Sequence, residues 1–502
     1  MPPPPAPSAA AASHSGRGFP YGSAALTAVA AITLVRWLVL AKSGLGLYGD
    51  EAQYWSWAQH PAPGYFSKPP LVAWVIAATT ALCGDGEPCV RAAAPLVHGA
   101  TSLVLFALAR LLYDRRIAFW TAVTFATLPA VSLSSMLIST DVPLLFFWSM
   151  TLLFLARTFE TRAMGYALGA GLCLGLGLFS KYAMAYIVPC ALVFCLMEPK
   201  ARWFVASRQA ALALAAATAV IAPNLFWNIE HGFVTFAHTA ANAAWSGSLF
   251  HPGHALEFLG AQFAVAGPIL FAAFLWLVVR FRPAAASYPE SFLIAFSAPV
   301  VIIVLVQAFL SRAHANWAAP AFAAGTVLAV AWLAQAKRAI WLKASLGLHV
   351  AAVVVLYGLA LAPPASLPFA DPFARLRGWS ELAAALGEKA AAQPGTAVLA
   401  DDRMVMAELL YYLRGRPVTV VMWDEGKDAR NQFEMTAGLS RAKESRFLLV
   451  SESPDTGRMA GRFRSIGPAE TLVVPLPGGR SRLFYLFDLE DPEPGDARNT
   501  RP

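Results

Sequence analysis

Long apolar runs separated by short polar loops constrain this chain more than any other feature. Runs fall at about 24–42, 91–112, 117–138, 142–158, 163–180, 182–197, 209–222, 257–279, 291–310, 318–335 and 344–361. A helix needs roughly 20 mainly apolar residues to cross the hydrocarbon core of a bilayer. The pattern predicts a polytopic α-helical membrane protein with about 11 transmembrane helices. A charged fraction of only 14% excludes a disordered protein or an ordinary soluble enzyme.

The charges divide the chain into two parts. Residues 1–365 carry 20 Lys and Arg against 11 Asp and Glu, whereas residues 366–502 carry 18 against 19. A basic surplus in short loops between apolar runs is typical of cytoplasmic loops, so it indicates a bilayer rather than nucleic acid as partner. We expect a disordered cytoplasmic tail (1–22), a membrane domain with interfacial helices on its outer face (23–365), a soluble domain (366–490) and a second disordered tail (491–502).

The apolar segment 71–84 decides the orientation. It has only about 14 residues, which favours an interfacial piece over a span. If it does not cross and the N-terminus lies inside, the basic loops near 115–116, 157–162, 200–208, 280–282 and 337–343 all fall on the cytoplasmic side, as the charge rule expects. The loop 43–91, the turn 139–141, the stretches 223–256 and 311–317 and the soluble domain then lie outside. Cys83 and Cys89 would face an oxidising compartment, as a disulfide or as two free thiols.

The last quarter of the chain changes to alternating elements. Helices are expected at 379–392 and 404–413, and strands at 396–400, 417–422, 446–451, 471–474 and 483–489. This pattern predicts a small α/β domain.

Carboxylates stand at two outer helix ends. Asp50 and Glu51 open an amphipathic segment that we expect to lie on the membrane as a helix. Asp141 stands alone between two apolar runs, where a lone carboxylate in lipid is costly, so it should face water or a cavity. Both aspartates also suit a purely structural role: Asp50 as an N-cap, and Asp141 as the cap before Pro143.

Two lysines lie beside aromatic residues at the same face. Lys68 precedes a rigid Pro-Pro turn and Lys181 follows Phe179-Ser180. Either cation could bind an anionic head group such as a lipid phosphate, or simply extend to lipid phosphates in general.

Amides, imidazoles and aromatic rings gather in the same outer segments. Such side chains suit a sugar ring, although an interfacial aromatic belt explains the tryptophans equally. The candidate substrate-binding residues are Tyr54, Tyr65, Asn224, Trp227, Asn228, His231, His314, Asn316 and Trp317. No HExxH, CxxC or paired-His spacing occurs, so no cofactor is indicated and a divalent metal stays open.

Five motifs resemble those of a known superfamily. DEAQYW…GYFSKPPL, TDVPLLFFW, LFSKYAMAYIVP, NLFWNIEHGFVTFAH and AHANWAAPAF occur in this order. They resemble the bacterial GT-C integral-membrane glycosyltransferases (families 39 and 83), which include protein O-mannosyltransferases, lipid A aminoarabinose transferases and lipopolysaccharide galacturonosyltransferases. The resemblance covers about residues 24–335, and the C-terminal domain matches only loosely.

The resemblance implies a GT-C fold in the bacterial inner membrane, with the active site and the C-terminal domain in the periplasm. The implied reaction transfers a sugar from a polyprenyl-phosphate donor to lipid A, lipopolysaccharide, another glycan or a protein, with inversion. Asp50, with Glu51 beside it, and Asp141 match the acidic positions of the family. Asp50 would take the proton of an acceptor hydroxyl, or orient a phosphate acceptor, while Asp141 would orient the acceptor or Asp50, or support a metal.

Lys68 matches the donor-phosphate position of the aminoarabinose branch, with Lys181 as a second cation. Many relatives have His-Pro-Pro where this chain has Lys68-Pro69-Pro70, which leaves the substrate branch open. The alternative function is a secondary transporter or flippase of an envelope precursor. Transporters place ionisable groups near the midplane in broken helices, whereas here they gather at outer helix ends. A non-catalytic scaffold does not account for the acidic pair together with Lys68.

Overall fold

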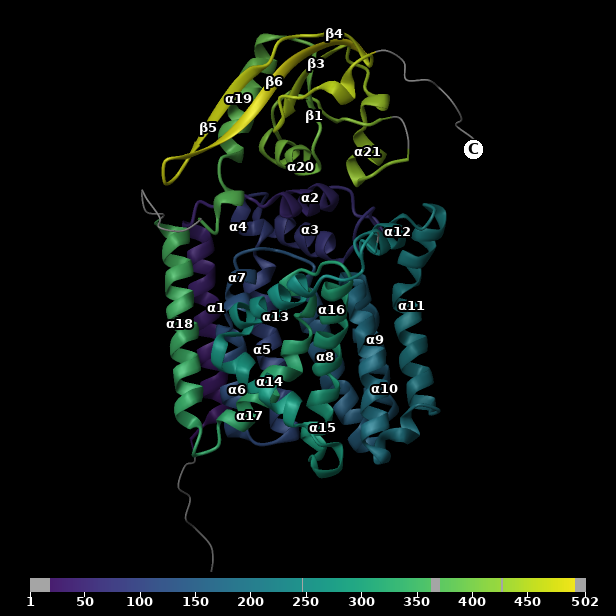
Figure 1. Cartoon of the computed structure of the whole chain (residues 1–502), viewed down its shortest axis with the longest axis vertical. Coiled ribbons are helices and arrows are strands. Elements are labelled where there is room, and N and C mark those ends of the chain that lie inside the picture. The colour runs from purple at the N-terminus through teal and green to yellow at the C-terminus, as the bar shows by residue number, and fades with distance from the viewer. Residues whose placement is uncertain (1–18, 246, 363–370, 426–427, 493–502) are drawn as a thin grey trace, which may run out of the picture.

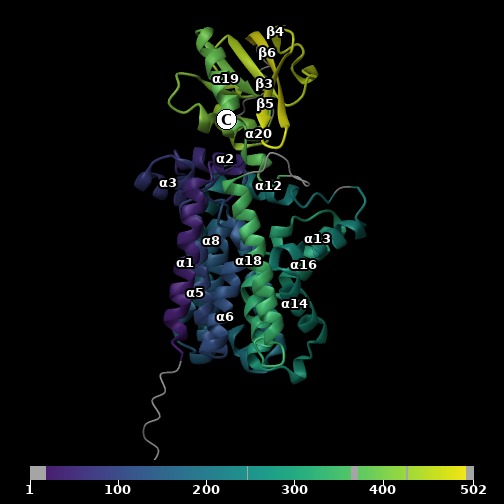
Figure 2. The ribbon, with the colours of Figure 1, turned by 90° about the vertical axis from the view of Figure 1, so that its left-hand side faces the viewer.

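A helical bundle carries a sheet domain stacked on one of its ends (Figure 1). The computed structural model describes residues 19–245, 247–362, 371–425 and 428–492. The domain boundary expected near 365 and most of the tails expected at 1–22 and 491–502 therefore lie outside the described residues. The inner ends of both expected tails are ordered elements, because α1 begins at Tyr21 and β6 extends to Pro492. The bundle is seen edge-on in Figure 2, with the sheet domain again above it.

The bundle consists of helices that correspond to the apolar runs of the sequence. They are α1 (Tyr21–Lys42), α5 (Ala93–Leu112), α6 (Arg115–Thr127), α7 (Pro129–Ser134), α8 (Asp141–Thr161), α9 (Met164–Ser180), α10 (Ile187–Met197), α11 (Arg208–Glu230), α13 (Pro252–Ala266), α14 (Pro268–Arg280), α15 (Tyr288–Ala295), α16 (Ala298–Leu310), α17 (Ala321–Leu333) and α18 (Ala339–Leu361). Short 3-10 helices η1 (Tyr182–Tyr186), η2 (Pro199–Phe204), η3 (Pro283–Ala285) and η4 (Ala315–Ala318) connect some of them.

Six helical stretches in the described residues are long and apolar enough to cross a membrane alone, and five shorter apolar helices accompany them. The chain is thus a multi-pass membrane protein. Three expected spans each divide into two α-helices, and one of them is 291–310, which divides into α15 and α16. The run 117–138 breaks at Leu128, because Pro129 disfavours helical backbone in the residue before it. The run 257–279 breaks at Gly267, because this glycine has a φ of 85°, which is not helical, and α14 begins at the next residue, Pro268.

The first break creates a buried polar contact inside the bundle. Arg36 of α1 is 1% exposed, and its guanidinium donates to the Ala126 carbonyl near the break and to the Ser132 hydroxyl. It also reaches the Tyr357 hydroxyl of α18 at 3.3 Å. A charge at this depth needs protein partners, and the broken helix supplies one of them. Arg36 thereby connects α1, α6, α7 and α18.

The sheet domain has a mixed six-stranded sheet. Its elements are η5 (Ala374–Leu376), α19 (Trp379–Ala392), β1 (Thr396–Ala400), α20 (Arg403–Tyr412), β2 (Val420–Met422), α21 (Gln432–Ala437), η6 (Leu439–Arg441), β3 (Arg446–Ser451), η7 (Gly457–Met459), β4 (Phe463–Ile466), β5 (Glu470–Leu476) and β6 (Arg480–Pro492). The order is β2-β1-β3-β6-β4, with β5 also paired to β6. β1 is parallel to β2 and β3, and β6 is antiparallel to β3, β4 and β5.

Three short helices lie between the bundle and the sheet domain (Figure 1): α2 (Gly49–Ala58), α3 (Leu71–Cys83) and α4 (Glu87–Val90). α2, which the sequence predicts as an amphipathic helix lying on the membrane, is a helix at the end of the bundle, and α20 packs onto it and helps to bury most of its residues. One hydrophobic core joins Ala52 and Trp55 of α2 to Leu409 and Phe484 of the sheet domain. α12 (Val234–Ala241) lies beside this layer at the edge of the bundle.

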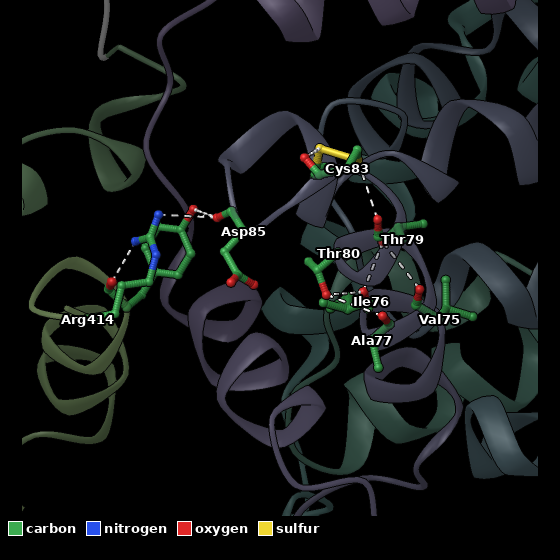
Figure 3. Close-up of a disulfide and its surroundings, with 10 residues drawn as sticks. Val75, Ile76, Ala77, Thr79, Thr80, Cys83, Asp85 and Arg414 are labelled. Atoms are coloured by element: carbon green, nitrogen blue, oxygen red, sulfur yellow. Dashed lines mark hydrogen bonds between the residues drawn. A yellow bond between two sulfur atoms is a disulfide. The ribbon is translucent and has the colours of Figure 1, made fainter.

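A disulfide and hydrogen bonds from the sheet domain hold the loop between α3 and α4 (Figure 3). Cys83 and Cys89 form a disulfide, which decides between the two alternatives left open by the sequence. The Asp85 carbonyl accepts hydrogen bonds from Tyr411 and Arg414 of the sheet domain, at 2.5 and 3.2 Å. These contacts attach the sheet domain to the first outer loop.

Candidate active site between the bundle and the sheet domain

Asp141 is held between two side chains from other helix ends. It is the first residue of α8, where the N-terminal helix dipole favours a negative charge. One carboxylate oxygen lies 2.7 Å from the Lys181 Nζ, just after α9, and the other accepts a hydrogen bond from the Asn316 Nδ2 of η4 at 2.7 Å. The side chain is 11% exposed. Three distant segments of the chain therefore orient one carboxylate.

Asp50 has a partner from the sheet domain. Its Oδ1 lies 2.9 Å from the Arg403 Nη1, and the same nitrogen donates to the Gln53 Oε1 at 2.5 Å. Asp50 and Arg403 are 39% and 36% exposed, so the pair faces solvent-accessible space. Asp50 is in the first turn of α2, again at a dipole position that favours a carboxylate.

Lys68 lies within electrostatic range of both carboxylates. Burial is the main cause that lowers the pKa of Lys68, and the charge of Lys181 lowers it further, while Asp50 and Asp141 act in the opposite direction. In the described part of the chain, Lys68 forms neither a hydrogen bond nor an ion pair with protein. Asp50, Asp141 and Lys181 therefore lie near Lys68, whose ammonium group has no protein partner within the described ranges.

The charged groups of the site also shift the pKa values of two neighbouring side chains, Tyr54 and His238. Tyr54 of α2 is buried, which raises its pKa well above the usual value, and the charges of Asp50, Arg403 and Asp141 all act on it. Burial, together with Lys68 and Arg403, lowers the pKa of His238 to about 4, so this imidazole is neutral at pH 7. Burial and the two nearby cations thus both favour the neutral imidazole.

Glu51 does not belong to this group of charged side chains. Its carboxylate is 1% exposed and forms a two-pronged ion pair with Arg91, at 2.9 and 2.6 Å. It also accepts hydrogen bonds from the backbone nitrogens of Tyr48 and Ile138, at 2.9 and 2.8 Å. Both oxygens are occupied by protein donors, so the geometry fits a structural role rather than the catalytic role expected from the sequence.

Several expected substrate-binding residues instead bind other parts of the protein. The Tyr65 hydroxyl donates to the Trp57 carbonyl at 3.0 Å. Asn224 donates to the Pro63 carbonyl and accepts from Tyr182, at 2.9 and 2.7 Å. The buried Asn228 binds the backbone of Asn224 and Thr235. These side chains fix the outer loops rather than point into open space.

The aromatic candidates form two ring pairs. Trp227 stacks on His231 with ring centroids 4.0 Å apart, and His314 meets Trp317 edge-on at 5.4 Å. The second pair flanks Asn316, which binds Asp141, and therefore lies next to the site. Trp227 lies against Gly64, where an added Cβ would come within 2.4 Å of the indole.

Arg403 and Gln53 are the site residues that sequence reasoning missed. Arg403 begins α20 directly after Asp402, whose side chain caps that helix. The capping pattern is visible in the sequence, but the position beside Asp50 depends on how the sheet domain docks. Among the described residues, no group of three or more His, Cys, Asp or Glu side chains could hold a metal ion.

Comparison with known proteins identifies the family. Residues 67–227 match the family model described as dolichyl-phosphate-mannose-protein mannosyltransferase. The lipid A galacturonosyltransferase RgtD of Rhizobium johnstonii is 40% identical over 393 residues, which are 78% of this chain and 82% of the relative. An undecaprenyl phosphate-alpha-4-amino-4-deoxy-L-arabinose arabinosyl transferase of Pseudomonas aeruginosa is 29% identical over 165 residues, 32% of this chain and 30% of the relative.

A solved structure has the same fold. ArnT from Cupriavidus metallidurans, bound to undecaprenyl phosphate, superposes with a TM-score of 0.62 at 17% identity, over 94% of this chain and 98% of the other. The likeness includes the sheet domain, because it extends over nearly the whole chain. Together with the five motifs and the long match at 40% identity, it shows that the chain belongs to the GT-C superfamily of integral-membrane glycosyltransferases.

Proposed function

We propose that this protein transfers a galacturonosyl group from a polyprenyl-phosphate donor to lipid A, at the periplasmic face of the bacterial inner membrane. The observation that carries the proposal is the 40% identity, over 82% of its length, to a lipid A galacturonosyltransferase. The polyprenyl carrier is supported by the solved neighbour, which holds undecaprenyl phosphate. The site lies at a bundle end, where a lipid-linked substrate can keep its tail in the bilayer.

The proposed reaction is a single displacement at the anomeric carbon of the sugar. The bond between the anomeric carbon and the phosphate oxygen breaks, and the polyprenyl phosphate leaves with the electron pair. An acceptor oxygen forms the new bond from the opposite face, which inverts the anomeric configuration. Asp50 takes the proton of an acceptor hydroxyl, or orients the acceptor where a phosphate is the nucleophile. Asp141, held by Lys181 and Asn316, orients the acceptor.

Lys68 is assigned to the donor phosphate because it is a partly buried cation that has no hydrogen-bond or ion-pair partner among the described residues. A hydrogen bond to a charged group contributes about 1.5–3 kcal/mol. Lys68→Met should therefore weaken undecaprenyl phosphate binding about 10-fold to 100-fold, measured by titration of the purified protein in nanodiscs. Lys389→Met is the matched control, since Lys389 pairs with Glu470 in the sheet domain. Equal affinity in Lys68→Met and wild type would remove the assignment.

The donor affinity should also depend on pH through Lys68. Its pKa is lowered by burial and by Lys181, so the ammonium form is lost at a lower pH than for an ordinary lysine. The contribution of Lys68 to the affinity should be present below this lowered pKa and be lost as the pH rises through it. Titration of undecaprenyl phosphate at increasing pH, with Lys68→Arg as the comparison, measures this. An arginine remains charged throughout, so its affinity should not fall.

The periplasmic orientation predicts which cysteines react. In spheroplasts treated with a reductant, a membrane-impermeant maleimide should label Cys83 and Cys89, which form an exposed disulfide in the first outer loop. Cys173, Cys190 and Cys195 are buried in the bundle and should stay unlabelled in the folded protein. Labelling that requires permeabilised membranes would place this loop in the cytoplasm and reverse the proposed orientation.

The function itself is tested by transfer. Purified protein, radiolabelled undecaprenyl-phosphate galacturonate and lipid A should give labelled lipid A and free undecaprenyl phosphate. Sealed proteoliposomes separate this from the transporter alternative, which predicts movement of intact donor across the bilayer without transfer. Mass spectrometry of lipopolysaccharide from a deletion strain should show loss of the uronic acid. Intact lipid A glycosylation in that strain would contradict the proposal.

A further inference from the structure

We propose that Arg403 of the sheet domain binds the carboxylate of the transferred sugar, and so selects a uronosyl donor over a neutral one. The inference rests on the proposed function, which supplies a galacturonosyl donor, and assigns to one residue the recognition of the acidic group. It gives the sheet domain a direct part in substrate choice. The argument comes from the position of Arg403, its unused nitrogens and the charge of the site.

The position of Arg403 is fixed by packing on both sides. Asp402 caps α20 by accepting hydrogen bonds from the backbone nitrogens of Met404 and Val405, at 2.7 and 3.2 Å. Met404 packs so closely against Gly49 that an added Cβ there would come within 2.6 Å of its methyl carbon. The first turn of α20 is therefore held against the first turn of α2, and Arg403 projects beside Asp50.

Only one edge of the guanidinium is used. Nη1 donates to Asp50 and to Gln53, whereas Nε and Nη2 have no hydrogen-bond partner within the described ranges. The side chain is 36% exposed, so this unused edge is accessible. Two parallel N–H groups in a rigid fork match a carboxylate in a bidentate manner. Arg403 can thus hold Asp50 with one nitrogen and a second carboxylate with the other two.

The charges of the site favour an anionic sugar. A uronosyl polyprenyl-phosphate donor carries two negative charges, one on the phosphate and one on the sugar. Lys68 is available for the first, while Lys181 is already paired with Asp141 at 2.7 Å. The neutral His238 does not supply a cation. Among the described cations near Lys68, Arg403 presents two adjacent N–H groups, on Nε and Nη2, without a protein partner, and this paired arrangement matches the sugar carboxylate.

The test compares two donors that differ only at this group. Undecaprenyl-phosphate galacturonate and undecaprenyl-phosphate galactose, which carries a hydroxymethyl group in place of the carboxylate, are used with wild type and Arg403→Gln. We expect KM for the uronosyl donor to rise about 10-fold to 100-fold in Arg403→Gln. KM for the galactosyl donor and the inhibition constant of sugar-free undecaprenyl phosphate should change less than about twofold, because neither presents a carboxylate.

Two further variants serve as controls for Arg403→Gln. Arg403→Lys keeps the charge but loses the fork, so it should give an intermediate KM for the uronosyl donor and should keep the contact with Asp50. Arg458→Gln removes another arginine of the sheet domain that pairs with an aspartate, Asp401, and should behave as wild type. If Arg403→Gln does not fold, the comparison of Arg403→Lys with wild type still tests the donor preference.

The outcomes separate this inference from the proposed function. If Arg403→Gln lowers kcat equally with both donors and leaves KM unchanged, Arg403 only positions Asp50, and the inference is overturned while the proposed function stands. If wild type uses the galactosyl donor as well as the uronosyl donor, the inference is likewise overturned. If wild type transfers neither sugar, the proposed function fails and the inference with it.

Discussion

Replacing Asp50 by asparagine is expected to lower kcat about 100-fold to 10,000-fold, which is the usual contribution of a general base. Asparagine has nearly the same shape and keeps an oxygen that can accept the hydrogen bond from Arg403. It cannot take up a proton under these conditions. Turnover is measured with labelled undecaprenyl-phosphate galacturonate in nanodiscs, and binding of sugar-free undecaprenyl phosphate should stay within about twofold of wild type.

Asp85→Asn is the matched control for this variant. Asp85 lies in the same outer loop and accepts a hydrogen bond from the Trp55 indole at 2.7 Å, which an asparagine oxygen preserves. This variant should keep wild-type turnover. A loss of less than about tenfold in Asp50→Asn would argue against proton transfer to Asp50 and leave it the orienting role that a phosphate acceptor requires.

Breaking the ion pair of Glu51 and Arg91 is expected to destabilise the fold rather than the chemistry. Both side chains are 1% exposed, and removal of one partner leaves the other buried without compensation. Such losses cost about 3–5 kcal/mol. Glu51→Ala and Arg91→Met should therefore each lower the thermal unfolding temperature in detergent by several degrees. The surviving folded fraction should bind undecaprenyl phosphate with wild-type affinity.

The two variants together distinguish a structural from a catalytic Glu51. The double variant should be less destabilised than the sum of the single variants, because the second substitution removes the charge stranded by the first. Arg157→Met is a control, since Arg157 pairs with Glu160 at an exposed position. A Glu51→Ala protein with wild-type unfolding temperature and lost turnover would restore the catalytic assignment.

Most of the fold follows from patterns of local residues. The apolar runs locate the helices, and β1 and β3 begin and end where their short apolar runs and flanking residues indicate. Three expected spans are interrupted. The breaks next to Pro129 and at Gly267 were missed because both residues lie inside apolar runs, and hydropathy does not reveal a bend in a helix. β4 and α21 are short, and β4 is held mainly by pairing to β6, which no local pattern reveals.

The site was predictable in part. Asp50, Asp141, Lys68 and Lys181 stand at helix ends or in loops of one face, and these ends meet wherever helices pack side by side. Glu51 was grouped with Asp50 because they are adjacent in sequence. Successive helical residues point about 100° apart, so Asp50 faces Arg403 while Glu51 faces the buried Arg91. Arg403 lies 353 residues from Asp50, and only tertiary docking brings them together.

The core that α2 shares with the sheet domain has a consequence for biosynthesis. A ribosome delivers α2 near the start of translation, but Leu409 and Phe484 emerge only after α18 has been made. A nascent chain with all its membrane helices inserted therefore lacks both the cover of α2 and the guanidinium beside Asp50. The candidate site is complete only when the last quarter of the chain has folded against α2, so a copy that ends after α18 lacks Arg403.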